Sequence, residues 1–162
     1  MPTLDSSRWD VTLDVDVVPL FLQLQWAQAR SLAGMRPSLE KYALSAAEFD
    51  LLATLRNAGA PYTLTPSQLL ARMVLTSGGL SKVMAQLETR GLIRRLQSAQ
   101  DLRIKPVQLS AAGRALIETA MVETVAATRA WLRATLRPEE LGQLTALLAK
   151  LAESGADEEK FA

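Results

Sequence analysis

The sequence predicts a mainly helical protein with one small β-hairpin, which places it in the α+β class. Apolar residues recur at helical spacing along most of the chain, and residues that cap helices stand before these stretches. The spacing of apolar residues changes to two only between Leu92 and Leu109. With 162 residues, 49% of them hydrophobic, the chain suits either one compact domain or one domain with dimer-forming extensions.

The first long helix is expected to begin after Asp16, which can cap it, and to end near Gly34 and Pro37. It carries apolar residues along two sides, so it should be buried on two sides. In a chain this short, the second covering surface is expected to be another subunit. The two stripes consist of Val17, Leu20, Phe21, Leu24 and Ala27, and of Val18, Leu22, Trp26 and Ala29.

Three shorter helices are predicted next, each from its own start and stop signals. The middle one is barely two turns long, and only a few residues separate it from the third. The predicted limits are Ser45 (with Glu48 as a capping box) to Gly59, Thr65-Pro66 to Met73, and Thr76 to Gly91.

The hairpin is predicted from two strand-like runs, Leu92 to Leu96 and Ile104 to Leu109, separated by a polar loop. Pro106 lacks a backbone N–H, so the second run is expected at a sheet edge. Ser110 can cap a long helix after the hairpin, and Pro138 can open a last one.

This order of elements is typical of a winged helix-turn-helix, here with long N- and C-terminal dimerisation helices. We therefore expect an N-terminal arm at 1–15 and an N-terminal dimerisation helix region at 16–44. A winged helix-turn-helix DNA-binding domain should occupy 45–114, C-terminal dimerisation helices 115–155, and an acidic tail 156–162.

Composition excludes many enzyme chemistries. The chain has no cysteine and no histidine, which removes thiolate nucleophiles, disulfides and the commonest metal ligand and general base. Its adjacent carboxylates, such as Glu139 and Glu140, stand at predicted helix starts, where the helix dipole favours them without catalysis. We expect no enzymatic activity, no cofactor and no metal. Without a signal peptide or membrane-length apolar run, a cytoplasmic location is expected.

Charge is segregated along the sequence. Residues 65–114 hold eight basic and two acidic side chains, a net charge of +6, whereas the whole chain carries 18 Lys+Arg against 17 Asp+Glu. The rest of the chain is therefore at −5. A local basic face of this kind favours binding to the phosphates of DNA. A merely solvated surface is the alternative interpretation.

The stretch SGGLSKVMAQLETRGLIRR at 77–95, followed by Asp101-Leu102-Arg103 and by VQLSAAG at 107–113, resembles the MarR family of bacterial transcription regulators. The resemblance covers roughly Leu44 to Met121. It implies a homodimer with a recognition helix in each major groove and a wing near each minor groove of a pseudo-palindromic operator. The wing departs from the usual Asp-Arg-Arg, and Ala85-Gln86 stands where Asp-Arg is usual.

Spacing along the third short helix assigns its two faces. Apolar residues at 80, 83, 84 and 87 form the packed face, so the remaining side chains face outward and are candidates for DNA contact. Arg103 either contacts DNA or forms a wing-stiffening ion pair with Asp101. The predicted DNA-binding residues are Ser77, Gly78, Ser81, Lys82, Gln86, Arg94, Arg95, Asp101, Arg103 and Lys105.

The resemblance also implies a small aromatic anion as effector, bound where the dimer helices meet the winged domain. Trp9 and Asp50 match the family branch that includes urate-responsive regulators, but Val83 stands where that branch has an arginine. Trp26 and Arg30 could add a stacking surface and a cation. Packing and solvation are the alternative roles of these side chains.

We therefore expect a dimeric DNA-binding transcriptional regulator, a repressor that a small aromatic or purine-like anion releases from its operator. Two alternatives stay open at this point. One is a winged-helix protein that acts through protein contacts, and the other is a regulator without a small-molecule effector.

Overall fold

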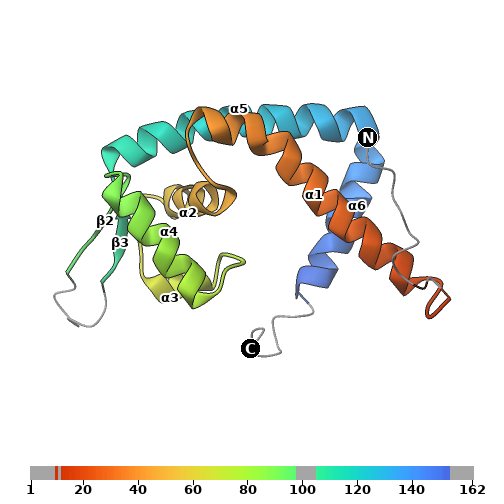
Figure 1. The fold of residues 1–162 in the computed structure, drawn as a ribbon. Helices are drawn as coiled ribbons and strands as arrows, with labels where there is room; N and C mark the ends of the chain where they lie inside the picture. The colour runs from red at the N-terminus through yellow and green to blue at the C-terminus, as the bar shows by residue number, and fades with distance from the viewer. Residues whose placement is uncertain (1–9, 11, 98–104, 154–162) are drawn as a thin grey trace.

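A computed structural model describes residues 10, 12–97 and 105–153 of the chain. Figure 1 shows the long helix α5 spanning the molecule, with the shorter helices and the sheet on one side and α6 and the start of α1 on the other. This arrangement confirms the predicted mainly helical class with a small β element. The elements are α1 (Val17–Lys41), α2 (Ala46–Asn57), β1 (Thr63–Leu64), α3 (Pro66–Leu70), α4 (Ser77–Thr89), β2 (Ile93–Arg95), β3 (Val107–Leu109), α5 (Ala111–Thr135) and α6 (Pro138–Glu153).

Local side-chain chemistry starts most of the helices where the sequence predicts. Ser45 and Glu48 form a reciprocal capping box on α2, and Thr65 forms one with Gln68 on α3. Ser110 caps α5 by accepting a hydrogen bond from the backbone N–H of Gly113, without a reciprocal bond because the third residue of the helix is glycine. These caps satisfy backbone donors that a helix start leaves open.

Two predictions about α1 are wrong. Asp16 makes no side-chain cap; the Asp14 carboxylate instead accepts hydrogen bonds from the backbone N–H groups of Asp16 and Val17. The helix also continues through Gly34 and Pro37 to Lys41. Packing explains this continuation, because the last turns bury side chains against α5 and the core, and this burial outweighs the poor helix propensity of both residues.

The sheet has three antiparallel strands in the order β1-β3-β2. Strand β3 is therefore central, and the predicted edge position of the second hairpin strand is wrong. Pro106 is tolerated because it stands just before the paired residues, where its carbonyl accepts from the Leu96 N–H. The sequence analysis missed β1, whose two residues pair with Val107 and Gln108.

The hydrophobic core is formed by side chains of α2, α3, α4, the sheet and the first half of α5, together with Leu39 near the end of α1. Near its start, α5 approaches the segment before β2 so closely that a Cβ on Gly113 would lie 2.1 Å from the Leu92 carbonyl oxygen. Helix α6, by contrast, buries none of its residues. The side chains fully buried in the core are Leu51, Leu52, Leu55, Leu69, Leu80, Leu87, Val107 and Ile117.

Candidate nucleic-acid interface and adjoining pocket

Helix α4 has one packed and one outward face, as its spacing predicts. Its apolar residues at 80, 83, 84 and 87 are all buried. The five α4 residues proposed for DNA contact are all exposed. Among them Lys82 carries the only charge. The exposed set is Ser77, Gly78, Ser81, Lys82 and Gln86.

The start of α4 contains two glycines with different surroundings. The Thr76 hydroxyl caps the helix by accepting a hydrogen bond from the Gly79 N–H at 3.2 Å. A Cβ on Gly79 would also lie 3.2 Å from that hydroxyl, so this glycine fits tightly against its own cap. A Cβ on Gly78 would meet nothing within 4 Å. The fold of the chain therefore does not require glycine at position 78.

The neighbouring arginines Arg94 and Arg95 on strand β2 point to different partners. Arg94 donates to the Gln108 side-chain oxygen at 2.7 Å, while Arg95 pairs with Glu88 at the end of α4 at 3.0 Å. Successive side chains of a strand lie on opposite faces of the sheet. Only one of these two arginines can therefore lie on the face of the sheet that continues the α4 surface, and its contact with Glu88 assigns that place to Arg95.

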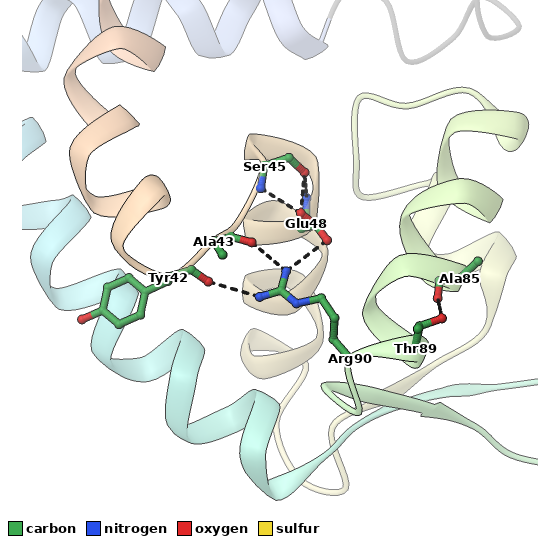
Figure 2. Close-up of polar contacts among 7 residues, drawn as sticks. All are labelled: Tyr42, Ala43, Ser45, Glu48, Ala85, Thr89 and Arg90. Carbon is green, nitrogen blue, oxygen red and sulfur yellow. Dashed lines mark hydrogen bonds and ion pairs between the residues drawn. The ribbon is translucent and has the colours of Figure 1, made fainter.

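The remaining basic residues of the segment differ in their availability. Lys105 is exposed just before β3, whereas Arg114 lies over the ring of Tyr62, 5.4 Å from its centre. Arg90 reaches back to α2, where its guanidinium donates to the Glu48 carboxylate (Figure 2). Asp101 and Arg103 lie outside the described residues, so their roles stay predictions.

A pocket of about 490 Å³ lies where α1, α2, α5 and α6 meet. Its walls are mostly apolar, and two arginines of α5 are among the residues that line it. The hydroxyl of Thr124 is buried there without a hydrogen-bond partner among the described residues. The lining consists of Ser31, Met35, Phe49, Met121, Thr124, Val125, Thr128, Arg129, Leu132, Arg133 and Leu141.

None of the described residues predicted for an effector, Trp26, Arg30 and Asp50, is in the lining of this pocket. Trp26 is half-buried on α1, Arg30 is exposed next to Ser31, and Asp50 follows the pocket residue Phe49. The pKa of Asp50 is raised by desolvation, although part of the residue remains exposed. Trp9 lies outside the described residues. The ligand-binding role of these four residues stays a prediction.

The sequence analysis missed three polar pocket residues, Thr124, Arg129 and Arg133. A signal for them exists in the sequence. Thr124 interrupts the apolar stripe of α5, and a hydroxyl in such a stripe needs a partner when buried. Arg129 and Arg133 follow one turn apart, so they share one side of the helix.

Comparisons with known proteins agree with this geometry. The MarR family model matches residues 44–105. The HTH-type transcriptional regulator PecS of Dickeya dadantii is 35% identical over 140 residues, which cover 85% of this chain and 84% of PecS. The chain belongs to the MarR family. It is thus a MarR-type transcriptional regulator, from a family of regulators rather than enzymes.

Two solved structures share the fold of this MarR-family chain. A mutant of MarR from E. coli, in complex with operator DNA, has a TM-score of 0.76 at 24% identity, covering 84% of this chain and 95% of MarR. BpsR of Bordetella bronchiseptica, whose DNA binding is regulated by 6-hydroxynicotinic acid, has a TM-score of 0.74 at 25% identity, covering 83% of this chain and 98% of BpsR. Within the described residues, no helix is long and apolar enough to cross a membrane.

Proposed function

We propose that this chain is a homodimeric repressor that binds a pseudo-palindromic operator through α4 and releases it when a small aromatic or purine-like anion binds. The observation that carries the proposal is the outward face of α4, which is exposed along its length above a fully buried face. Its first three turns contain no acidic residue, and a helix of this form fits the major groove.

Charge around α4 supports contact with phosphates. Lys82 projects from the helix itself, Arg95 lies at its far end and Lys105 is exposed at the base of the wing. Arg95 can still exchange the Glu88 carboxylate for a phosphate, because the two side chains are 34% and 42% exposed.

Exposed apolar side chains support a dimer formed by α1 and α6. The first apolar stripe of α1 remains open to solvent in the single chain, with Leu20 53% exposed. On α6, Leu147 is 58% exposed. A second copy of the chain would cover these surfaces, as the two-sided pattern of α1 predicts.

The pocket at the junction of the four helices supports an anionic effector. Its volume lies within the range of about 300–1,000 Å³ that is usual for small-molecule sites. The apolar walls suit a planar ring, Arg129 and Arg133 offer cations for a carboxylate or enolate, and the Thr124 hydroxyl lacks a partner among the described residues. Trp26, Arg30 and Asp50 surround this site in the proposal, and regulation of the relative BpsR by 6-hydroxynicotinic acid supports the ligand class.

The decisive experiment is a gel-shift assay with the DNA upstream of the chain's own coding region. Wild-type protein should bind with an affinity that falls steeply with salt, since each neutralised phosphate contributes a slope of about −0.9. Lys82→Ala should weaken binding and lower that slope, whereas Arg36→Ala, an exposed change on α1, should not. Absence of any operator binding would overturn the proposal in favour of a protein-contact function.

A ligand panel tests the effector. Aromatic acids and purines that bind the pocket should quench tryptophan fluorescence and weaken operator binding together, because a ligand shifts an equilibrium only by its differential affinity for the two states. Asp50→Ala and Arg129→Ala should uncouple the two effects while ligand-free operator affinity stays at the wild-type level. If no compound changes either signal, the chain is a regulator without an effector of this class.

A further inference from the structure

The C-terminal end of α4 is fastened to a distant part of the chain by one side chain, Arg90. Its guanidinium donates to the Ala43 carbonyl at 2.7 Å and to the Tyr42 carbonyl at 3.1 Å. It also pairs with the Glu48 carboxylate at 3.2 Å. Figure 2 shows this fork reaching from α4 to the connection between α1 and α2. We call this set of contacts the Arg90 latch.

The Arg90 latch contacts the chain at the C-terminal end of α1. Tyr42 is the C-cap that follows Lys41 of α1, and Ala43 comes next with a left-handed φ of 50°, a backbone conformation that needs support from its surroundings. Carbonyl oxygens at a helix end lack intrahelical donors and carry the negative end of the helix dipole. A guanidinium placed there supplies hydrogen-bond donors to these carbonyls and a positive charge at the negative end of the dipole.

The partners of Arg90 are themselves held in place. One oxygen of Glu48 takes part in the α2 capping box, accepting from the Ser45 N–H at 2.8 Å, while the other faces Arg90. The side chain of Tyr42 donates through its hydroxyl to Glu123 on α5 at 2.8 Å. Arg90 therefore joins α4 to a framework built from α1, α2 and α5.

Arg90 is also unsuited to bind phosphate in this arrangement. Three acceptors already occupy its guanidinium, and two of them are backbone carbonyls, which cannot rotate away as the single carboxylate partner of Arg95 can. It nevertheless lies close to the outward face of α4, because Gln86, a predicted DNA contact, lines the same shallow hollow as Arg90 and Glu48.

We propose that Arg90 is a positioning residue that sets the angle of α4 against α1 and α5, and thereby the separation of the two recognition helices in the dimer. This inference rests on the proposed function, since the separation matters only if both copies of α4 bind one operator. A planar fork is needed to reach two carbonyls and one carboxylate together, so lysine cannot replace arginine fully.

Spin labels on one chain test the position of α4 directly. The natural chain has no cysteine, so Gln23→Cys on α1 and Ser81→Cys on α4 provide two unique sites, both exposed. Gln23 lies on neither apolar stripe of α1. Diluting the labelled protein with excess unlabelled protein restricts the measured distance to one chain, whatever its oligomeric state.

Arg90→Gln should at least double the width of the distance distribution or shift its maximum, and Arg90→Lys should fall between it and wild type. Arg56→Gln is the matched control, because it removes a 3.5 Å ion pair between α2 and α5 without touching α4. If Arg90→Gln fails to fold, the distance distribution of Arg90→Lys, which keeps the charge, tests the proposal instead. A distribution for the variants equal to that of Arg56→Gln overturns the proposal.

Operators with altered spacing provide the functional arm. Wild-type protein should lose affinity sharply when one base pair is inserted between the half-sites. Arg90→Gln should bind the natural operator at least tenfold more weakly and discriminate less between the two spacings. Equal discrimination by this variant and wild type contradicts the positioning role. If wild type binds no operator, the proposed function fails, and the spin-label result still decides whether Arg90 holds α4.

Discussion

Replacing Gly113 with alanine should strongly destabilise the protein. The new Cβ would lie 2.1 Å from the Leu92 carbonyl oxygen, 2.9 Å from its carbon and 3.0 Å from a methyl of Leu109. Two of these atoms belong to the backbone, which cannot rotate away as a side chain can. Helix α5 and the segment before β2 must therefore separate by roughly 1.3 Å to restore ordinary contact.

The magnitude follows from what this separation disrupts. Overpacking of a dense core costs typically about 1–3 kcal/mol. The Leu92 carbonyl also accepts the backbone N–H of Ser110 at 3.0 Å, and Ser110 in turn donates its hydroxyl to Gly91 and caps α5. Weakening that hydrogen bond adds about 1 kcal/mol. We expect a total loss of roughly 2–4 kcal/mol in the free energy of unfolding.

Urea denaturation, followed by circular dichroism at fixed protein concentration, measures this loss. Gly34→Ala is the matched control, because a Cβ at that position in α1 meets nothing within 4 Å. That control should be neutral or stabilising by up to about 1 kcal/mol through its better helix propensity. If Gly113→Ala lowers the free energy of unfolding by less than about 0.5 kcal/mol, the close approach of α5 to Leu92 is not as described.

Three further predictions concern single changes. Gly78→Ala should stabilise the free protein by about 0.4–1 kcal/mol in thermal unfolding yet weaken operator binding, because only a DNA backbone would meet its methyl group. Equal operator affinity would show that DNA does not approach Gly78 closely. Glu123→Gln should destabilise the protein at pH 7, where hydrogen bonds from Lys41 and Tyr42 hold the pKa of Glu123 below its ordinary value of 4.5. The difference should close as the pH falls from about 4.5 through that lowered pKa, since protonation removes the interaction in wild type, and a pH-independent difference contradicts this. Leu148→Asp should convert the dimer to a monomer in light scattering, because Leu148 is 41% exposed on α6 and a second copy would bury it. A dimer of wild-type strength would exclude this face of α6 from the interface.

Sequence reasoning located the helix starts because they depend on local chemistry. Ser45, Thr65, Thr76 and Ser110 each accept a backbone N–H three residues onward, a contact encoded in consecutive residues. The end of α1 was missed because it depends on packing against α5, which overrides the weak helix propensity of Pro37. Strand β1 was missed because two residues carry too little pattern to indicate a strand.

The candidate site likewise has one part that local sequence predicts and one part that depends on contacts distant in sequence. The outward face of α4 follows from the spacing of its apolar residues, so the exposed positions of Lys82 and Gln86 were predictable. The Arg90 latch was not, because its partners lie 42, 47 and 48 residues away in sequence. From the sequence, Arg90 contributes only to the net charge of residues 65–114, whereas its contacts show that it joins α4 to the connection between α1 and α2.

The lack of buried residues in α6 has a consequence for how the regulator accumulates in a cell. A helix of sixteen residues without a buried face is marginal by itself in water. In the proposed dimer, α6 therefore becomes stable only when two chains associate, and the rate of folding is second order in chain concentration. At low expression, newly made chains would expose their apolar helices to proteases, and the amount of competent repressor would rise more steeply than the amount of protein synthesised.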